Sequence, residues 1–117
     1  MRILLADDQT KVRFALRVLL ERGSGLEVVG EAVDAADLLA QAETTCPDMV
    51  LLDWGLPGPA MGDLLASLRR ICPDIAIVAL SARLEVRPEA LAAGADAFVC
   101  KCDPPDRLLA VISDCGG

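Results

Sequence analysis

The sequence has no His and no Tyr, and it has few aromatic residues of any kind: one Trp and two Phe among 117 residues. Without His the chain cannot form a Ser-His-Asp triad, a Cys-His catalytic pair or a His-ligated zinc site. Positive charge is scarce too, since 11 Lys and Arg stand against 18 Asp and Glu, which gives a net charge of −7. Because phosphate contacts need clustered Lys and Arg, we expect no direct binding of nucleic acid.

Long apolar runs are also absent. The N-terminal apolar run, Ile3–Ala6, is too short for a signal peptide, and no stretch approaches the length of a membrane span. We therefore expect a cytoplasmic protein that has no membrane partner.

The five Cys form no recognisable framework, because their number is odd and no Cys-x-x-Cys pair occurs. We expect free thiols in a reducing compartment, with a redox or metal role as the alternative. Cys100 and Cys102 are two residues apart, a spacing that places both on one face of a strand. The five residues are Cys46, Cys72, Cys100, Cys102 and Cys115.

The chain does contain a regular alternation of short apolar runs and helical patterns. The apolar runs predict strands over residues 3–6, 26–32, 49–52, 75–80 and 97–100. The helical patterns predict helices over about residues 12–21, 35–46, 64–71, 88–94 and 104–112. Alternation of this kind is typical of a three-layer α/β sandwich, with a parallel sheet between two layers of helices. The length fits one domain, residues 1–117.

Chemically active side chains follow the predicted strands. Asp7 and Asp8 come after the first strand, Asp53 ends the third, and Ser81 and Lys101 follow the fourth and fifth. In an open parallel sheet, ligands bind beyond the carboxyl ends of the strands, so we expect these residues to gather at one edge. Asp34, after the second strand, is interpreted only as a helix N-cap.

Three carboxylates at one edge repel one another unless a cation neutralises them. Oxygen ligands without His or Cys select Mg²⁺, and a carboxylate beside such a cation can attack phosphorus. We therefore predict Asp53 as the nucleophile, Asp7 and Asp8 as metal ligands, and Ser81 and Lys101 as contacts for phosphoryl oxygens. Each residue alone has a simpler interpretation, such as a helix cap for Asp7 or Asp8, but four strand ends carrying complementary groups favour a site.

The motifs resemble those of a known family. They are Asp7-Asp8, Leu-Asp-Trp-Gly-Leu-Pro-Gly around Asp53, Ser81-Ala82, Gly94-Ala95-Asp96-Ala97-Phe98, and Lys101. Over essentially its whole length the chain resembles the receiver domain of two-component response regulators, the CheY-like domain. Lys101-Cys102-Asp103-Pro104 looks most like the receivers of LuxR-type transcription factors. The resemblance implies a flavodoxin-like (βα)5 fold with strand order 2-1-3-4-5.

The resemblance also implies roles for the site residues. Asp53 would accept a phosphoryl group from a histidine kinase or phosphotransfer protein. Mg²⁺ would be held by Asp7, Asp8, Asp53 and the backbone carbonyl of Gly55. Such a domain is a phospho-acceptor that assists its own phosphorylation and dephosphorylation, rather than an enzyme acting on other substrates.

A second set of implied roles concerns signalling. Ser81 and Lys101 would contact the phosphoryl group, and Phe98 would turn inward as Ser81 moves. The face made by the fourth helix, fifth strand and fifth helix would then change its partners. By its pattern alone, Phe98 would be a plain core residue. In this family, two positions beside the pocket tune the lifetime of the phosphoryl group, and here they are Gly55 and Arg83. The Arg83 side chain would either close over the pocket or be solvated.

Two features depart from the family pattern. Cys102 stands where the family usually has Pro, which removes the usual reason for a cis peptide there. Pro88 predicts that the fourth helix is short or irregular.

The resemblance also implies partners. They include an attached or separate output domain and, after phosphorylation, a second copy of the chain.

Three other functions were compared with this one. A degenerate receiver would act as a protein-interaction module without phosphate. An aspartyl-phosphate phosphatase needs a second Asp two residues after the nucleophile, where this chain has Gly55. A flavodoxin-like cofactor binder needs a phosphate-binding loop after the first strand, where Asp7-Asp8-Gln9 would repel a phosphate.

Overall fold

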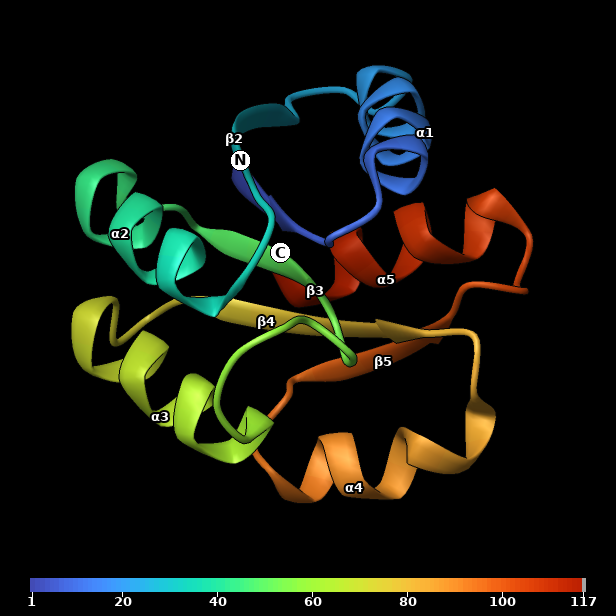
Figure 1. Ribbon diagram of the computed structural model, residues 1–117. Coiled ribbons are helices and arrows are strands. Elements are labelled where there is room, and N and C mark those ends of the chain that lie inside the picture. Colours follow the sequence, from blue (N-terminus) through green and yellow to red (C-terminus); the bar gives the residue numbers. More distant parts are fainter. Residues whose placement is uncertain (117) are drawn as a thin grey trace.

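Strands and helices alternate along the whole chain in the computed structural model, which describes residues 1–116 (Figure 1). Gly117, the last residue of the predicted domain, lies outside the described residues. The strands are β1 (Arg2–Ala6), β2 (Glu27–Ala32), β3 (Met49–Asp53), β4 (Ala76–Ser81) and β5 (Ala97–Cys100). The helices are α1 (Thr10–Glu21), α2 (Ala35–Thr45), α3 (Met61–Ile71), α4 (Arg87–Ala92) and α5 (Pro105–Gly116), with a 3₁₀ turn at Leu84–Val86. Each predicted strand and helix is therefore present, with shifted ends.

The five strands form one parallel sheet in the order β2-β1-β3-β4-β5, which confirms the predicted fold. The most polar of the predicted strands, β2, lies at an edge, where its outer backbone groups can meet water. In the registers, Ala6 lies beside Leu52, Asp53 beside Leu80, and Ser81 beside Cys100. The carboxyl ends of β1, β3, β4 and β5 are therefore level, and the residues that follow them share one edge of the sheet.

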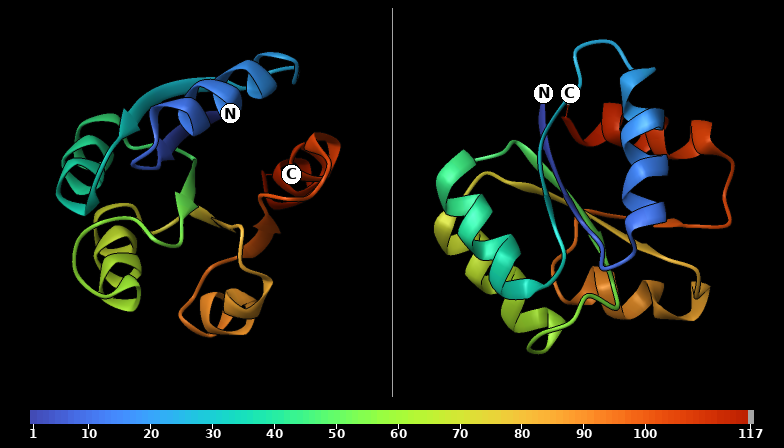
Figure 2. Two further views of the ribbon diagram at one scale, coloured as in Figure 1. Left: turned by 45° about the vertical axis from the view of Figure 1, so that its right-hand side comes forward. Right: turned by 45° about the horizontal axis from the view of Figure 1, so that its top comes forward.

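Helices cover both faces of the sheet, as the continuous apolar runs of the central strands require (Figures 1 and 2). On one face α2, α3 and α4 pack against the strands through residues such as Leu38, Leu68 and Ala90. On the other face α1 and α5 pack through residues such as Leu20 and Ile112. Alternate residues along each strand point to the two faces, so the sheet separates two hydrophobic cores.

Local signals in the sequence set several helix ends. The Asp34 side chain accepts a hydrogen bond from the Asp37 backbone N–H (2.8 Å), which confirms the predicted N-cap of α2. Pro88 lies in the first turn of α4, which has only six residues after its 3₁₀ turn, as expected for a short fourth helix. All described peptide bonds are trans, including the one before Cys102. Within residues 1–116, no helix combines the length and apolar character needed to cross a bilayer.

Candidate functional site

Asp7 lies directly beyond β1 and is 1% exposed, the one fully buried charged residue among those described. Its backbone N–H donates to the Ala32 carbonyl (3.0 Å), which extends the pairing of β1 with β2 by one residue. Its Oδ1 accepts the Gln9 N–H (2.9 Å), and its carbonyl oxygen accepts a bond from Arg13 Nη1 (2.7 Å). Gln9, not Asp7 or Asp8, is the N-cap residue of α1, and its side chain makes no capping bond. The interpretation of the acidic pair as a simple helix cap is therefore wrong.

Asp53 is the last residue of the central strand β3. The Trp54 N–H still pairs with the Leu80 carbonyl of β4 (2.8 Å), and the chain then turns, because the Leu56 N–H donates back to the Asp53 carbonyl (3.1 Å). A Cβ atom at Gly55 would lie 3.8 Å from Asp53 Oδ2, so the backbone of Gly55 borders the carboxylate. Asp53 thus projects from the sheet edge into a space that Gly55 leaves open.

Carboxylate oxygens of Asp7, Asp8 and Asp53 lie within 4.8 Å of one another. Lys101, directly after β5, reaches into this cluster: its Nζ lies 2.8 Å from Asp7 Oδ2 and 3.1 Å from Asp53 Oδ1. The backbone N–H of Lys101 donates to the Ser81 carbonyl (2.9 Å), which fixes the start of its side chain against β4. Strands β1, β3 and β5 therefore bring the predicted carboxylates and the predicted cation together.

The charges of the cluster perturb Lys101. Burial by itself lowers the pKa of a lysine, but the hydrogen bonds and attraction from Asp7 and Asp53 outweigh it, so the pKa of Lys101 is raised above its ordinary value. Lys101 is therefore a cation at neutral pH, although its side chain is only 24% exposed. One ammonium beside three carboxylates leaves the pocket with net negative charge.

The donor set of this pocket suits Mg²⁺. It consists of carboxylate oxygens at a spacing that one ion can span, with no His or Cys among them. Asp7 is buried and fixed, whereas Asp8 is exposed, so the opening of the pocket leaves room for the waters that Mg²⁺ retains. The excess of negative charge supplies the reason for a cation to bind there.

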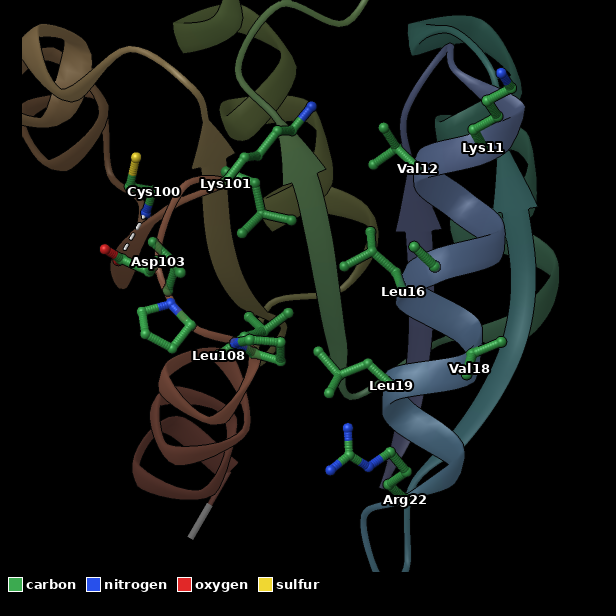
Figure 3. A pocket seen from close by; sticks show the side chains of 15 residues that line it. Lys11, Val12, Leu16, Val18, Leu19, Arg22, Cys100, Lys101, Asp103 and Leu108 are labelled. Carbon is green, nitrogen blue, oxygen red and sulfur yellow. Dashed lines mark hydrogen bonds between the residues drawn. The ribbon is translucent and has the colours of Figure 1, made fainter.

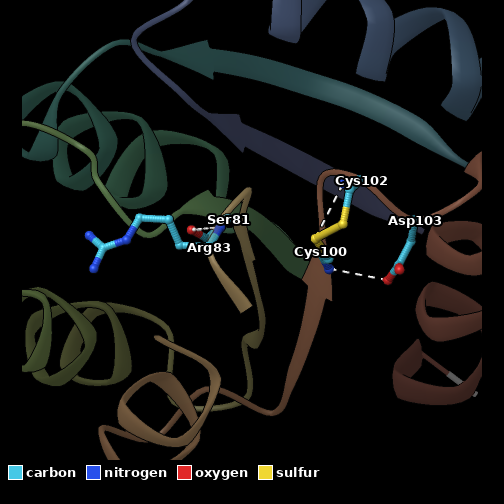
Figure 4. The surroundings of a disulfide bond; sticks show 5 residues. All are labelled: Ser81, Arg83, Cys100, Cys102 and Asp103. Atoms are coloured by element: carbon cyan, nitrogen blue, oxygen red, sulfur yellow. Dashed lines mark hydrogen bonds between the residues drawn. A yellow bond between two sulfur atoms is a disulfide. The ribbon is translucent and has the colours of Figure 1, made fainter. Parts of the chain in front are cut away.

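Ser81 is the last residue of β4, and Arg83 follows it by two residues. The Ser81 hydroxyl accepts the Arg83 backbone N–H (3.0 Å), as Figure 4 shows, so its oxygen has a local partner in this structure. The Arg83 guanidinium pairs with Glu85 (2.9 Å) and is largely exposed. Of the two predicted positions of Arg83, this structure therefore has the solvated one.

Phe98 and Trp54 both lie in the core under α4. Phe98 is 7% exposed and belongs to the same cluster as Ala90 and Ala95, so it already points inward here. The predicted coupling of Phe98 to Ser81 stays a prediction. Trp54, next to Asp53, donates from Nε1 to Glu89 Oε2 on α4 (2.7 Å). Sequence reasoning missed this link, because residues 35 apart carry no local signal of their contact.

The prediction of five free thiols is wrong for one pair, since Cys100 and Cys102 form a disulfide (Figure 4). Cys102 is not on the strand: β5 ends at Cys100 and the chain turns, which brings the two side chains together around Lys101. The spacing of two residues was the signal that could have indicated this. Cys46, Cys72 and Cys115 are free, as predicted, and they line a pocket of about 720 Å³ that also contains Asp48 and Asp74.

A groove of about 470 Å³ lies beside the acidic cluster, between α1 and α5 (Figure 3). Leu16 and Leu19 of α1 face Leu108 of α5 across it, and Cys100, Lys101 and Asp103 line one end. On α1, Phe14 and Val18 are exposed. The turn that carries Lys101 thus forms part of both the acidic cluster and the groove.

The chain is similar to a known protein family and to several of its members. The model of the family described as response regulator receiver domain matches residues 3–113. The response regulator UvrY of Escherichia coli is 30% identical over 112 residues, which cover 94% of this chain and 51% of UvrY. BvgA of Bordetella pertussis, whose name assigns it to the regulation of transcription, is 35% identical over 103 residues, 86% of this chain and 48% of BvgA. The chain therefore spans about half the length of these curated relatives.

Solved structures give the same result. A two-component response regulator of the LuxR family from Aurantimonas superposes with a TM-score of 0.88 at 33% identity, covering 97% of this chain and 82% of that one. At this identity the likeness supports the same family as the family model does.

Proposed function

The chain belongs to the response regulator receiver domains of two-component systems, and on that premise we propose that residues 1–117 form one receiver domain that accepts a phosphoryl group on Asp53. The contact of Lys101 Nζ with both Asp7 and Asp53, within a cluster of three carboxylates, carries the proposal. A lysine that spans two acids can remain in place when one of them becomes a phosphate ester, because it then pairs with the phosphoryl oxygens.

The residues of the pocket take complementary parts in this reaction. Asp7, Asp8, Asp53 and the Gly55 carbonyl would hold Mg²⁺, which neutralises charge between the carboxylates and the incoming phosphoryl group. A carboxylate oxygen of Asp53 attacks phosphorus as the bond to the donor nitrogen of a phosphohistidine breaks. Lys101 and Ser81 contact the phosphoryl oxygens, for which the Ser81 hydroxyl must leave the Arg83 N–H. The same groups would assist hydrolysis of the phosphoryl group, with Gly55 and Arg83 setting access for water.

The partners follow from the same proposal. The phosphoryl donor is a histidine kinase or phosphotransfer protein, because this chain has no His of its own. The LuxR family of the Aurantimonas regulator and the greater length of UvrY and BvgA support an output domain that regulates transcription, attached or separate. Such regulation takes place in the cytoplasm, where this acidic domain would act through protein contacts, including a phosphorylation-dependent dimer, and not by touching DNA. Movement of Ser81, with repacking of the already buried Phe98, would alter the face formed by α4, β5 and α5.

The test uses Trp54, the single Trp, which lies next to Asp53. We expect its fluorescence to change when Mg²⁺ is added and to change again with beryllofluoride, a mimic of the phosphoryl group. Acetyl phosphate should add one phosphoryl group, detected by mass spectrometry of the intact protein. Asp53→Asn should abolish both the beryllofluoride response and the mass gain.

Asp74→Asn is the matched control, because Asp74 is an exposed carboxylate in the turn before β4, at the other end of that strand. It should behave as the wild type in both measurements. A wild-type protein that gains no phosphoryl group at saturating Mg²⁺ and acetyl phosphate would contradict the proposal and favour a phosphate-independent interaction module.

A further inference from the structure

The disulfide lies on either side of the functional lysine. Cys100 is the last residue of β5, Cys102 follows in the turn, and their Cα atoms are 5.1 Å apart. Lys101 is the one residue between them, and its ammonium contacts Asp7 and Asp53. The disulfide therefore closes a small ring through the backbone of Lys101.

The two sulfur atoms have different surroundings. Cys100 is 2% exposed, whereas Cys102 is exposed. The backbone N–H of Cys102 donates to Cys100 Sγ (3.3 Å), as Figure 4 shows. An incoming thiolate can therefore reach only the sulfur of Cys102. The sulfur of Cys100 would be the leaving group, and the Cys102 N–H beside it can stabilise the thiolate that forms. Exposed disulfides of this kind are the labile ones.

The position of this disulfide is not that of a structural cross-link. The stabilisation that a disulfide gives through the unfolded chain grows with the length of the loop it closes, and here the loop is three residues. Hydrogen bonds hold the same turn without it: the Cys100 N–H donates to Asp103 Oδ2 (3.2 Å), and the Asp103 N–H donates to the Cys100 carbonyl (3.0 Å). Opening the ring should therefore leave the fold intact while giving Lys101 more freedom.

We propose that Cys100 and Cys102 form a redox site that exchanges with small thiols, and that its disulfide holds Lys101 in place over Asp7 and Asp53. In reduction, a thiolate attacks Cys102 Sγ and the Cys100 thiolate leaves and takes a proton from water. A second thiolate then attacks the attached small-molecule sulfur, which frees Cys102 and releases the small-molecule disulfide. The protein gains two electrons and two protons, and two thiols are oxidised. Oxidation by glutathione disulfide is the reverse.

The effect on Lys101 rests on the proposed phosphoryl-accepting function. With the ring closed, Lys101 is already oriented when the phosphoryl group arrives, so less conformational freedom is lost on binding. Immobilising one flexible side chain corresponds to a factor of about three to ten in affinity. We therefore expect the oxidised protein to bind beryllofluoride, in the presence of Mg²⁺, about fivefold more tightly than the reduced protein.

The experiment first follows the thiols. The protein is equilibrated with reduced and oxidised glutathione in varied ratios, quenched with acid, alkylated after unfolding so that buried Cys72 and Cys100 also react, and weighed by mass spectrometry. The wild type should show three alkylated thiols at the oxidised end and five at the reduced end. Cys46→Ser, which removes an exposed free thiol outside the pair, should undergo the same two-thiol transition. Cys102→Ser should undergo none. If the wild type shows no two-thiol transition, the redox site is overturned.

The second measurement is the beryllofluoride affinity of each form by Trp54 fluorescence. Cys102→Ser should match the reduced wild type in both buffers, and Cys46→Ser should show the wild-type difference. Equal affinities of oxidised and reduced wild type would overturn the coupling to Lys101, even where the thiols exchange. If neither form binds beryllofluoride or gains a phosphoryl group, the proposed function fails, while the thiol count still decides the redox site.

Discussion

Asp7 is a charged side chain buried where water does not compensate it, and such a charge is stable only with partners. Lys101 and the Gln9 N–H supply them. Asp8 is different, because it is exposed and adds negative charge to the same cluster. The residues of the pocket thus divide into a fixed ion pair and a carboxylate that water can solvate.

This division predicts the effect of Asp8→Asn. Without Mg²⁺, the variant loses repulsion from Asp7 and Asp53, which is worth about 1 kcal/mol for charges some 4 Å apart in water, so the protein should be more stable to heat. With Mg²⁺, a ligand is missing, so the stabilisation by the ion should fall. Thermal unfolding in a chelator and in a Mg²⁺ titration measures both. Asp74→Asn, which is remote from the cluster, should show neither effect. Equal stabilisation of Asp8→Asn and wild type by Mg²⁺ would contradict the role of Asp8 as a metal ligand.

At this scale, the sequence predicts which residues meet but not how their side chains are paired. Asp7, Asp53 and Lys101 were predictable because parallel strands all end at one edge, whatever the rotamers. The bond of the Ser81 hydroxyl to the Arg83 N–H and the pairing of Cys100 with Cys102 depend on torsion angles within a turn. No periodicity in the sequence reports such angles.

Among the elements, edge strand β2 is fastened to α1 by one carboxylate. Glu31 accepts bonds from Arg13 Nε (3.0 Å) and from Arg17 Nη2 (2.6 Å). The periodicity of α1 assigns both arginines to the side away from the core, and here that side faces β2 rather than water alone. The hydrogen bond from Arg17 is the largest cause that lowers the pKa of Glu31 below its ordinary value, with Arg13 adding to it.

Glu31→Gln should therefore destabilise the protein in a way that depends on pH. Because the pKa is lowered in the folded state, the ionised carboxylate contributes stability above its unfolded pKa, near 4.5, and loses it as the pH falls through the folded value. At pH 7 we expect a loss of about 1 kcal/mol, since the groups are partly exposed. Urea denaturation at pH 7 and near pH 3 should show this difference shrink. Glu27→Gln is the control, because Glu27 has a longer contact to Arg2 (3.9 Å), and it should lose less stability. A loss of stability in Glu31→Gln that does not depend on pH would argue against the ion pairs.

The short helix α4 is joined to the site by one hydrogen bond. Only Ala90 of its six residues is buried, so few apolar contacts hold the helix to the sheet. The bond from Trp54 Nε1 to Glu89 (2.7 Å) links it directly to the residue after Asp53. Pro88 made the length of α4 predictable, but not this attachment.

Glu89→Ala should loosen α4 and change the surroundings of Trp54. The indole N–H is partly buried, so losing its partner should cost about 1 kcal/mol. Exchange of amide hydrogens over residues 84–92 should become faster. The fluorescence of Trp54 should shift in the absence of any phosphoryl mimic. Glu43→Ala, which removes an exposed carboxylate on α2 away from Trp54, is the control and should leave the spectrum unchanged. An unaltered Trp54 spectrum in Glu89→Ala would refute the link.

In the whole molecule, one sheet serves two hydrophobic cores. Strands β1, β3 and β4 are buried almost throughout, so their runs carried no alternation from which to assign residues to a face. The alternation of strands and helices was enough to predict the three layers, and the resemblance supplied the strand order. Which helices share a face follows from the topology, with α1 and α5 on one side, rather than from any helix's own pattern.

The two cores should nevertheless unfold as one. Ile77 of β4 packs with α2, α3 and α4, whereas Ile112 of α5 packs with α1 on the opposite face. Ile77→Val and Ile112→Val should each cost about 0.5–1.5 kcal/mol, and because the sites share no cluster their effects should add within about 0.5 kcal/mol in the double variant. Urea unfolding is followed by two probes. Trp54 fluorescence reports on the first core, and circular dichroism reports on the whole fold. The two transitions should coincide. Separate transitions by the two probes would show instead that the layer of α1 and α5 can detach while the sheet and the layer around Trp54 remain folded.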